Sequence, residues 1–187
     1  MLSQNRFKES GRNLLTSALL IVVGCGLLGA SPSAQTASEP AVKAEMIRRF
    51  PEFVQWPGPA LQPRDDIRLC FSPNHPFKSE VPALSAGPRV NGHALQVREL
   101  RAGDTPDGCH LLYVAAADLD LLHRVRNRPL VTVGDQPDFC KLGGIINFRI
   151  ISGRVRFDVN VDQAQLVGLK FDSQFLRLAS TLIKRQP

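Results

Sequence analysis

The sequence predicts an α/β fold, namely a single domain in which helices flank a mixed sheet of about six strands. Two near-continuous apolar runs, at residues 110–115 and 130–134, are typical of strands that are covered on both faces. Segments with helical spacing alternate with the strand candidates. Nearer the C-terminal end, two alternating segments flank Ser152-Gly153, which predicts a β-hairpin followed by helices.

The first helix is expected over residues 41–54. Its apolar residues recur on one side at helical spacing, at Val42, Met46, Ile47, Phe50 and Val54. Pro51 lies within this pattern, and because proline removes a helical hydrogen bond, we expect the helix to kink or end just before it. Trp56 is the only tryptophan of the chain and follows Phe53 closely; both side chains are interpreted as anchors of the core.

The six strands are expected at residues 67–72, 94–100, 110–115, 130–134, 145–151 and 154–159. Further helices are expected at 77–85, 118–126, 162–167 and 173–183, and Asp118 is the expected N-cap of the second of these. The last helix is expected to turn five apolar side chains toward the core: Phe175, Leu176, Leu178, Ala179 and Leu182.

The second hairpin strand is expected to be half buried. Three apolar residues alternate in it with three charged ones, which are Arg154, Arg156 and Asp158. Because successive side chains of a strand point to opposite faces, this pattern predicts one buried and one solvated face. Phe157 in this strand and Phe148 in the preceding one complete the set of expected core anchors.

The N-terminal segment, residues 1–34, is typical of an export signal. Three basic residues precede an uncharged apolar run over residues 14–28, and small residues follow it. Val22-Val23-Gly24-Cys25 resembles a lipobox, which makes Cys25 a candidate for lipidation. Residues 35–40 are polar and small and are expected to be a tether, so the domain is expected over residues 41–187. The mature protein is therefore expected to be exported, either free or lipid-anchored.

Charge argues against a nucleic-acid partner. The formal net charge of the chain is +6, but acidic residues separate the basic ones. A basic stripe with interleaved aromatic residues, which is typical of nucleic-acid binding, does not occur in the sequence.

Cysteine usage agrees with an oxidising compartment. Three cysteines follow the export signal, Cys70, Cys109 and Cys140, which suggests one disulfide and one cysteine left over. The sequence alone leaves all three pairings open. The remaining thiol is expected to pack as a small apolar group, the alternative being a disulfide with another chain.

The polar residues form no recognisable catalytic or metal-binding pattern. The four histidines lie far apart in the chain and none has the spacing of a metal-ligand pair. Cys109 and His110 are adjacent on an extended segment, so their side chains point to opposite faces and make a poor dyad. Asp135 and Asp138 could suggest a cation site, but capping of a following short helix is the favoured role. We therefore expect no enzyme activity, no metal and no cofactor.

Several motifs occur in an order that resembles the YfiR family, whose domain is also called DUF4154. They include Phe53-Val54-Gln55-Trp56-Pro57, Cys109-His110-Leu111-Leu112, Gly143-Gly144-Ile145-Ile146-Asn147-Phe148 and Val155-Arg156-Phe157-Asp158-Val159-Asn160. The resemblance implies a periplasmic α/β protein that binds the periplasmic sensor domain of a membrane-bound diguanylate cyclase and represses it. Repression lowers cyclic di-GMP and biofilm formation. An OmpA-like outer-membrane lipoprotein and a second copy of the chain are further implied partners.

The resemblance also bears on the cysteines. Cys70 and Cys109 match the positions of one family disulfide. Cys140 resembles the first half of a second disulfide, but Asn147 stands where its partner is expected, so Cys140 is expected to be unpaired within the chain. An alternative function is a small-ligand or redox sensor, with a pocket around Phe53, Trp56 and the sheet, that acts on another signalling protein.

Overall fold

The computed structural model describes residues 37–184. The predicted export signal, the lipidation candidate Cys25 and the first residues of the predicted tether lie outside this range. The helices are α1 (Glu39–Arg49), α2 (Val81–Ser85), α3 (Leu119–Val125), α4 (Val161–Leu166) and α5 (Ser173–Leu178), with 3₁₀ turns η1 (Phe50–Phe53) and η2 (Ala116–Asp118). Among the described residues, no helix has the length and apolar character needed to cross a membrane.

The nine strands of the described chain form two sheets. Their bounds are β1 (Val54–Gln55), β2 (Ile67–Phe71), β3 (Leu95–Glu99), β4 (Leu111–Tyr113), β5 (Val131–Gly134), β6 (Ile146–Ile151), β7 (Arg154–Asn160), β8 (Lys170–Phe171) and β9 (Thr181–Ile183). The main sheet has seven strands in the order β3-β2-β4-β5-β6-β7-β9, and β1 pairs with β8. In the main sheet β6 and β7 pair antiparallel and all other neighbours pair parallel. The predicted α/β fold with a mixed sheet is confirmed.

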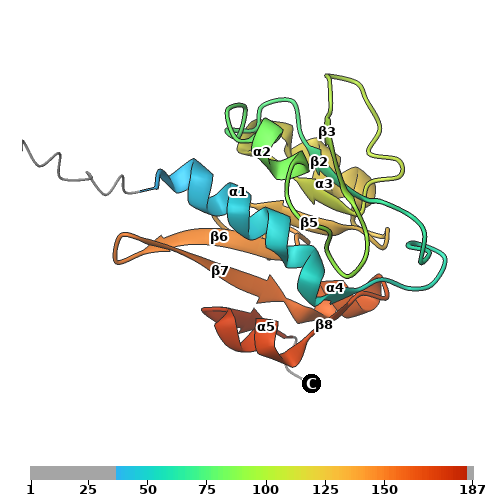
Figure 1. Cartoon of the computed structure of the whole chain (residues 1–187). Helices are drawn as coiled ribbons and strands as arrows, with labels where there is room; N and C mark the ends of the chain where they lie inside the picture. Colours follow the sequence, from blue (N-terminus) through green and yellow to red (C-terminus); the bar gives the residue numbers. More distant parts are fainter. Residues whose placement is uncertain (1–36, 185–187) are drawn as a thin grey trace, which may run out of the picture. The chain divides into compact units, whose positions relative to one another are not determined.

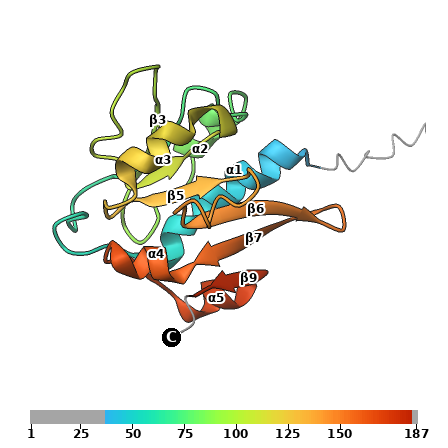
Figure 2. The same cartoon turned by 180° about the vertical axis from the view of Figure 1, so that it is seen from behind.

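The sheet is covered differently on its two faces. Helix α1 crosses one face (Figure 1), and α3 lies against the other (Figure 2). The apolar run of β4 explains this arrangement, because Leu111 and Tyr113 belong to the core cluster under α1, whereas Leu112 belongs to the cluster under α3. The strands in the middle of the sheet are therefore buried on both faces.

Helix α1 ends where proline predicts. It begins at Glu39, two residues before the expected start, because the Ser38 side chain caps it by accepting a hydrogen bond from the Ala41 N–H. At Phe50 it passes into the 3₁₀ turn that contains Pro51. The Phe50 ring lies within 5.6 Å, centroid to centroid, of the rings of Phe148, Phe157 and Phe175.

The expected core anchors differ in burial. Phe148 is 1% exposed and Phe157 is 5% exposed. Phe53 and Trp56 are only partly buried and pack against the same core cluster. The first two therefore lie within the core, while the other two lie at its margin.

The hairpin of β6 and β7 is closed by the predicted two-residue turn. Ser152 has a φ of 50° and Gly153 a φ of 70°, so both residues are left-handed, as a type I′ turn requires. The last pair of the hairpin ladder joins Ile151 to Arg154. Glycine supplies one of the two left-handed positions without steric cost.

The predicted helix at residues 173–183 is wrong in its second half. Helix α5 ends at Leu178, Ala179 is extended, and residues 181–183 form β9, which pairs with β7. β-branched residues at 181 and 183 favour a strand, and the Ser180 N–H donates to the Phe157 carbonyl, which directs the chain onto the sheet. Phe175 is buried, whereas Leu178 and Leu182 are exposed and do not point inward as predicted.

Two further expectations are corrected. Asp118 occupies the N-cap position of α3, but its carboxylate accepts hydrogen bonds from the backbone N–H and the side-chain amide of Asn74 and does not cap the helix. Asp158, expected on a solvated face, is only 6% exposed. The two-residue strands β1 and β8 were not predicted, because they are too short for a periodic pattern.

Candidate functional site

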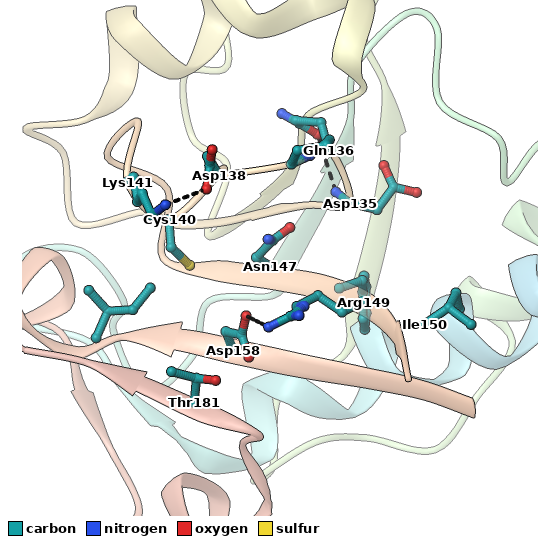
Figure 3. A pocket seen from close by; sticks show the side chains of 13 residues that line it. Asp135, Gln136, Asp138, Cys140, Lys141, Asn147, Arg149, Ile150, Asp158 and Thr181 are labelled. Carbon is teal, nitrogen blue, oxygen red and sulfur yellow. Dashed lines mark hydrogen bonds and ion pairs between the residues drawn. The ribbon is translucent and has the colours of Figure 1, made fainter. Parts of the chain in front are cut away.

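A hollow of about 590 Å³ lies beside the hairpin, between the loop that follows β5 and the strands β6, β7 and β9 (Figure 3). Six side chains that line it matter for its chemistry: Asp135, Gln136, Cys140, Asn147, Arg149 and Asp158. They come from one long loop and two strands that are neighbours in the sheet. The hollow is therefore built by the same segment that carries the most specific motifs of the sequence.

Two glycines leave space for a buried ring of the loop between β5 and β6. The Phe139 side chain is fully buried, and a Cβ atom added to Gly144 would lie 2.3 Å from its ring. A Cβ atom added to Gly134 would lie 2.8 Å from the same ring. Only glycine permits this close approach of backbone and ring, so Gly144 in the Gly143-Gly144 motif has a packing role.

One rim of the hollow is held by a buried ion pair. The Lys43 Nζ atom lies 2.8 Å from Asp135 and 2.6 Å from Glu39, although Lys43 is only 6% exposed. Burial lowers the pKa of Lys43, but its hydrogen bonds to the two carboxylates outweigh this effect and raise the pKa above its ordinary value. Asp135 is therefore a partner of α1, which differs from the capping role expected for it.

The floor of the hollow contains buried polar atoms without a partner. Asp158 receives a hydrogen bond from Arg149 at 3.3 Å through Oδ2, while its Oδ1 atom has none. Gln136 is 8% exposed, and its Nε2 atom likewise has no partner. Asn147, with its amide nitrogen turned inward, donates to the carbonyls of Gly134 and Gln136 at 3.3 and 3.2 Å. Because buried polar groups are normally paired, these two atoms are exceptions among the residues that line the hollow.

Cys140 is a free, buried cysteine in the wall of the hollow. Its thiol donates to the Ile145 carbonyl at 3.6 Å. Burial raises the pKa of the Cys140 thiol to about 12, and the charge of Asp158 adds to this. The thiolate, which is the reactive form, is therefore disfavoured.

The other two cysteines, Cys70 and Cys109, are joined by a disulfide, with their Cα atoms 5.9 Å apart. Cys70 lies in β2 and is fully buried in the cluster under α3. Cys109 precedes β4, the neighbour of β2 in the sheet. The bond therefore links two adjacent parallel strands across 39 residues of sequence.

The buried histidines have structural hydrogen bonds. The Nδ1 atom of His110 accepts from the Arg68 N–H at 2.9 Å, so its Nε2 atom donates to the Ala60 carbonyl at 3.1 Å. Burial lowers the pKa of His110 below its ordinary value. His75 accepts from the Phe77 N–H and contacts Glu99 at 2.8 Å. Within residues 37–184, no three His, Cys, Asp or Glu side chains are grouped so as to hold a metal ion.

The pocket expected around Phe53 and Trp56 is small. A hollow of about 170 Å³ is lined by Trp56 together with residues such as Pro51 and His93, and Phe53 does not line it. Phe53 stacks on Phe175 instead, with 5.5 Å between ring centroids. Sequence reasoning therefore missed the larger hollow. The Gly143-Gly144 motif and the Asp135 to Cys140 loop were the only sequence signals for it.

Comparison with known proteins gives one informative match. A family model described as YfiR/HmsC-like matches residues 40–180. No curated protein matches the sequence. Among solved structures, a conserved domain protein from Vibrio cholerae O1 biovar El Tor is similar at 11% identity and a TM-score of 0.45, over 78% of this chain. The similar region covers 60% of the length of that protein.

Proposed function

This chain belongs to the YfiR/HmsC-like family, a regulatory family, and from that membership we propose that it binds and represses the periplasmic sensor domain of a membrane-bound diguanylate cyclase. Repression lowers cyclic di-GMP and with it biofilm formation. The observation that carries this proposal is the family match, which extends from the start of α1 to the residues after α5.

The structure offers a surface that suits such a role. The neighbouring face of the hairpin presents exposed arginine and isoleucine side chains beside the hollow. Groups of this kind are suited to contact with another protein. Burial of Cys140, which raises the pKa of its thiol, argues against thiol chemistry at this position.

The disulfide supports the proposed location in the periplasm. Disulfides form and persist in oxidising compartments, and the bond between Cys70 and Cys109 is largely enclosed by the core. An OmpA-like outer-membrane lipoprotein that relieves the repression, and a second copy of this chain, belong to the same proposal as further partners.

The first test is cellular cyclic di-GMP in a strain that lacks the gene. Deletion is expected to raise cyclic di-GMP, and the wild-type gene is expected to restore the original level. The double variant Cys70→Ala/Cys109→Ala is expected to fail, because it removes the disulfide. Cys140→Ala is the matched control, since it removes a buried cysteine that is not bonded, and it is expected to restore the level. An unchanged level after deletion would contradict the proposal.

The second test is direct binding. The oxidised protein, beginning at residue 37, is presented to the purified periplasmic domains of the diguanylate cyclases of its own organism. We expect a complex with at least one of them, measured by isothermal titration calorimetry. A protein that binds none of these domains would refute the proposed function.

A small-ligand sensor is the second candidate. It is favoured by the hollow of about 590 Å³, whose lining includes the polar side chains of Gln136, Asn147 and Asp158. A cavity of this volume with a few polar side chains is typical of small-molecule sites. The test is the thermal midpoint of the protein in a panel of polar metabolites, with Asp158→Asn as the matched variant. A panel that leaves the wild-type midpoint unchanged would count against this candidate.

A further inference from the structure

Within residues 37–184, one face of the C-terminal half of the sheet has no helix over it. Its members come from β6, β7 and β9, and we call it the open face: Asn147, Arg149, Ile151, Arg154, Arg156, Asp158 and Thr181. They share one side of the sheet because strand side chains alternate and these residues lie opposite one another in register. The intervening residues, such as Phe148 and Phe157, belong to the core cluster under α1.

The helix on this side of the sheet lies elsewhere. Helix α3 packs against β2 and β4, and its core cluster includes no residue of β6, β7 or β9 within the described part of the chain. Figure 2 views the sheet from this side, with α3 over one part and the hairpin uncovered. The hollow of Figure 3 lies at the inner end of the open face.

The outer end of the open face carries uncompensated positive charge. Arg149 lies directly opposite Arg156 in the ladder, and like charges in this arrangement destabilise a hairpin. Arg149 is paired with Asp158, but neither Arg154 nor Arg156 forms an ion pair among the described residues, and both are exposed. Ile151, on the same face, is 37% exposed. In the free protein, the only ion pair that offsets this repulsion among the described residues is the one between Arg149 and Asp158.

The shape of the inner end distinguishes a protein from a lipid surface. A flat bilayer cannot enter a hollow of about 590 Å³, whereas a side chain of a protein can. The three carboxylates that line the hollow are each paired with a basic side chain, Asp135 with Lys43, Asp138 with Lys141 and Asp158 with Arg149. Arginines beside an exposed isoleucine and a hollow therefore fit a protein segment with acidic and apolar side chains.

We propose that the open face is the docking surface for an acidic segment of the partner protein, whose carboxylates pair with Arg154 and Arg156. The proposal rests on the proposed function, because it specifies the chemistry of the partner that the protein binds. It adds which strands make the contact and what charge the partner presents there.

The test is a charge reversal on the hairpin. The partner is the periplasmic cyclase domain that binds the wild-type protein, and the variant is Arg154→Glu/Arg156→Glu. Its affinity is expected to fall by about tenfold or more, because attraction is replaced by repulsion. Its thermal midpoint is expected to be unchanged or higher, because the second substitution turns the like-charge pair with Arg149 into an opposite-charge pair. A merely structural role of the two arginines would lower both quantities.

The matched control is Arg64→Glu/Arg124→Glu, which changes the net charge equally. Both of these arginines are exposed and neither forms an ion pair among the described residues. The control is expected to keep its affinity within about threefold of wild type, since it alters only long-range electrostatics. An equal loss in the control would overturn the proposal, because the effect would then be one of net charge.

The remaining outcomes separate the two proposals. If hairpin variant and wild type bind equally well, the open face is not the docking surface, while the proposed function stands. If the wild type binds no cyclase domain, both proposals fail. If the wild type sediments with phosphatidylglycerol vesicles and Arg154→Glu/Arg156→Glu does not, the face binds lipid and the docking proposal is overturned.

Discussion

Removal of the disulfide between Cys70 and Cys109 is expected to cost the protein a large part of its stability. The bond closes a loop across 39 residues of sequence. In the chain-entropy model, a cross-link of that span lowers the free energy of the folded state relative to the unfolded chain by about 4 kcal/mol. Domains of ordinary size are stable by only about 5–15 kcal/mol, so the loss would leave a marginal fold.

The assay is urea unfolding, followed by circular dichroism and by the fluorescence of Trp56. The variant is Cys70→Ala/Cys109→Ala, because Cys70 is fully buried and a serine hydroxyl there would add a desolvation cost. For a slope of about 2 kcal/mol per molar urea, the midpoint falls by roughly 2 M. The slope itself is expected to rise, since the unfolded chain without the cross-link is less compact.

Two controls isolate the cross-link. Wild-type protein treated with a reductant loses the bond but no side-chain atoms, and its free energy of unfolding is expected to fall by the same amount. Cys140→Ala removes a buried thiol that is not bonded, so its loss of about 1 kcal/mol reports packing alone. Oxidised and reduced wild type that differ by less than about 1 kcal/mol would refute the entropic reasoning.

Three further predictions concern the packing and the protonation of the core. Gly144→Ala places a methyl group 2.3 Å from the buried ring of Phe139 and is expected to cost about 2 kcal/mol in urea unfolding, whereas Gly58→Ala, with no atom within 4 Å, is expected to be nearly neutral. Phe148→Ala removes a ring that is 1% exposed and is expected to cost about 4 kcal/mol by the same assay. Because burial lowers the pKa of His110, the unfolded chain takes up a proton first as the pH falls below about 6.5, so the free energy of unfolding falls with it.

A substitution of His110 tests the pH dependence, and a comparison of the two glycine variants tests the packing. His110→Gln is expected to reduce this pH dependence without abolishing it, because the pKa of His75 is also lowered by burial. A variant with the full wild-type pH dependence would show that His110 is not responsible. For Gly144→Ala, a cost no larger than that of Gly58→Ala would mean that the ring of Phe139 can move aside.

The local signals in the sequence predicted most of the architecture. The two-residue turn at Ser152-Gly153 and the strands buried on both faces were predicted from residues close together in sequence, and the structure confirms both predictions. The end of α1 before Pro51 follows from the chemistry of one residue. The prediction for residues 173–183 was partly wrong because a short apolar pattern fits a helix and a strand alike. Residues 181–183 form a strand because the edge of β7 provides backbone hydrogen-bond partners for them.

The candidate site was harder to predict because it depends on contacts that are distant in sequence. The pair of Lys43 and Asp135 spans 92 residues, and no spacing rule connects them. The burial of Asp158 depends on the loop around Cys140 and on β9, which was expected to be a helix. The pairing of Cys70 with Cys109 could be inferred from the family resemblance, whereas the residues alone left three choices.

Because Arg149 lies opposite Arg156, the stability of the hairpin and its affinity for an acidic partner both depend on ionic strength. Dissolved salt screens repulsion and attraction alike, over a Debye length of about 8 Å at physiological concentration. In the free protein, screening relieves the repulsion between the two guanidinium groups, so the hairpin becomes more stable. In the proposed complex, the same screening weakens the attraction to acidic side chains. Folding and binding would therefore respond to ionic strength in opposite directions, and surroundings of low salt would favour the bound, repressing state.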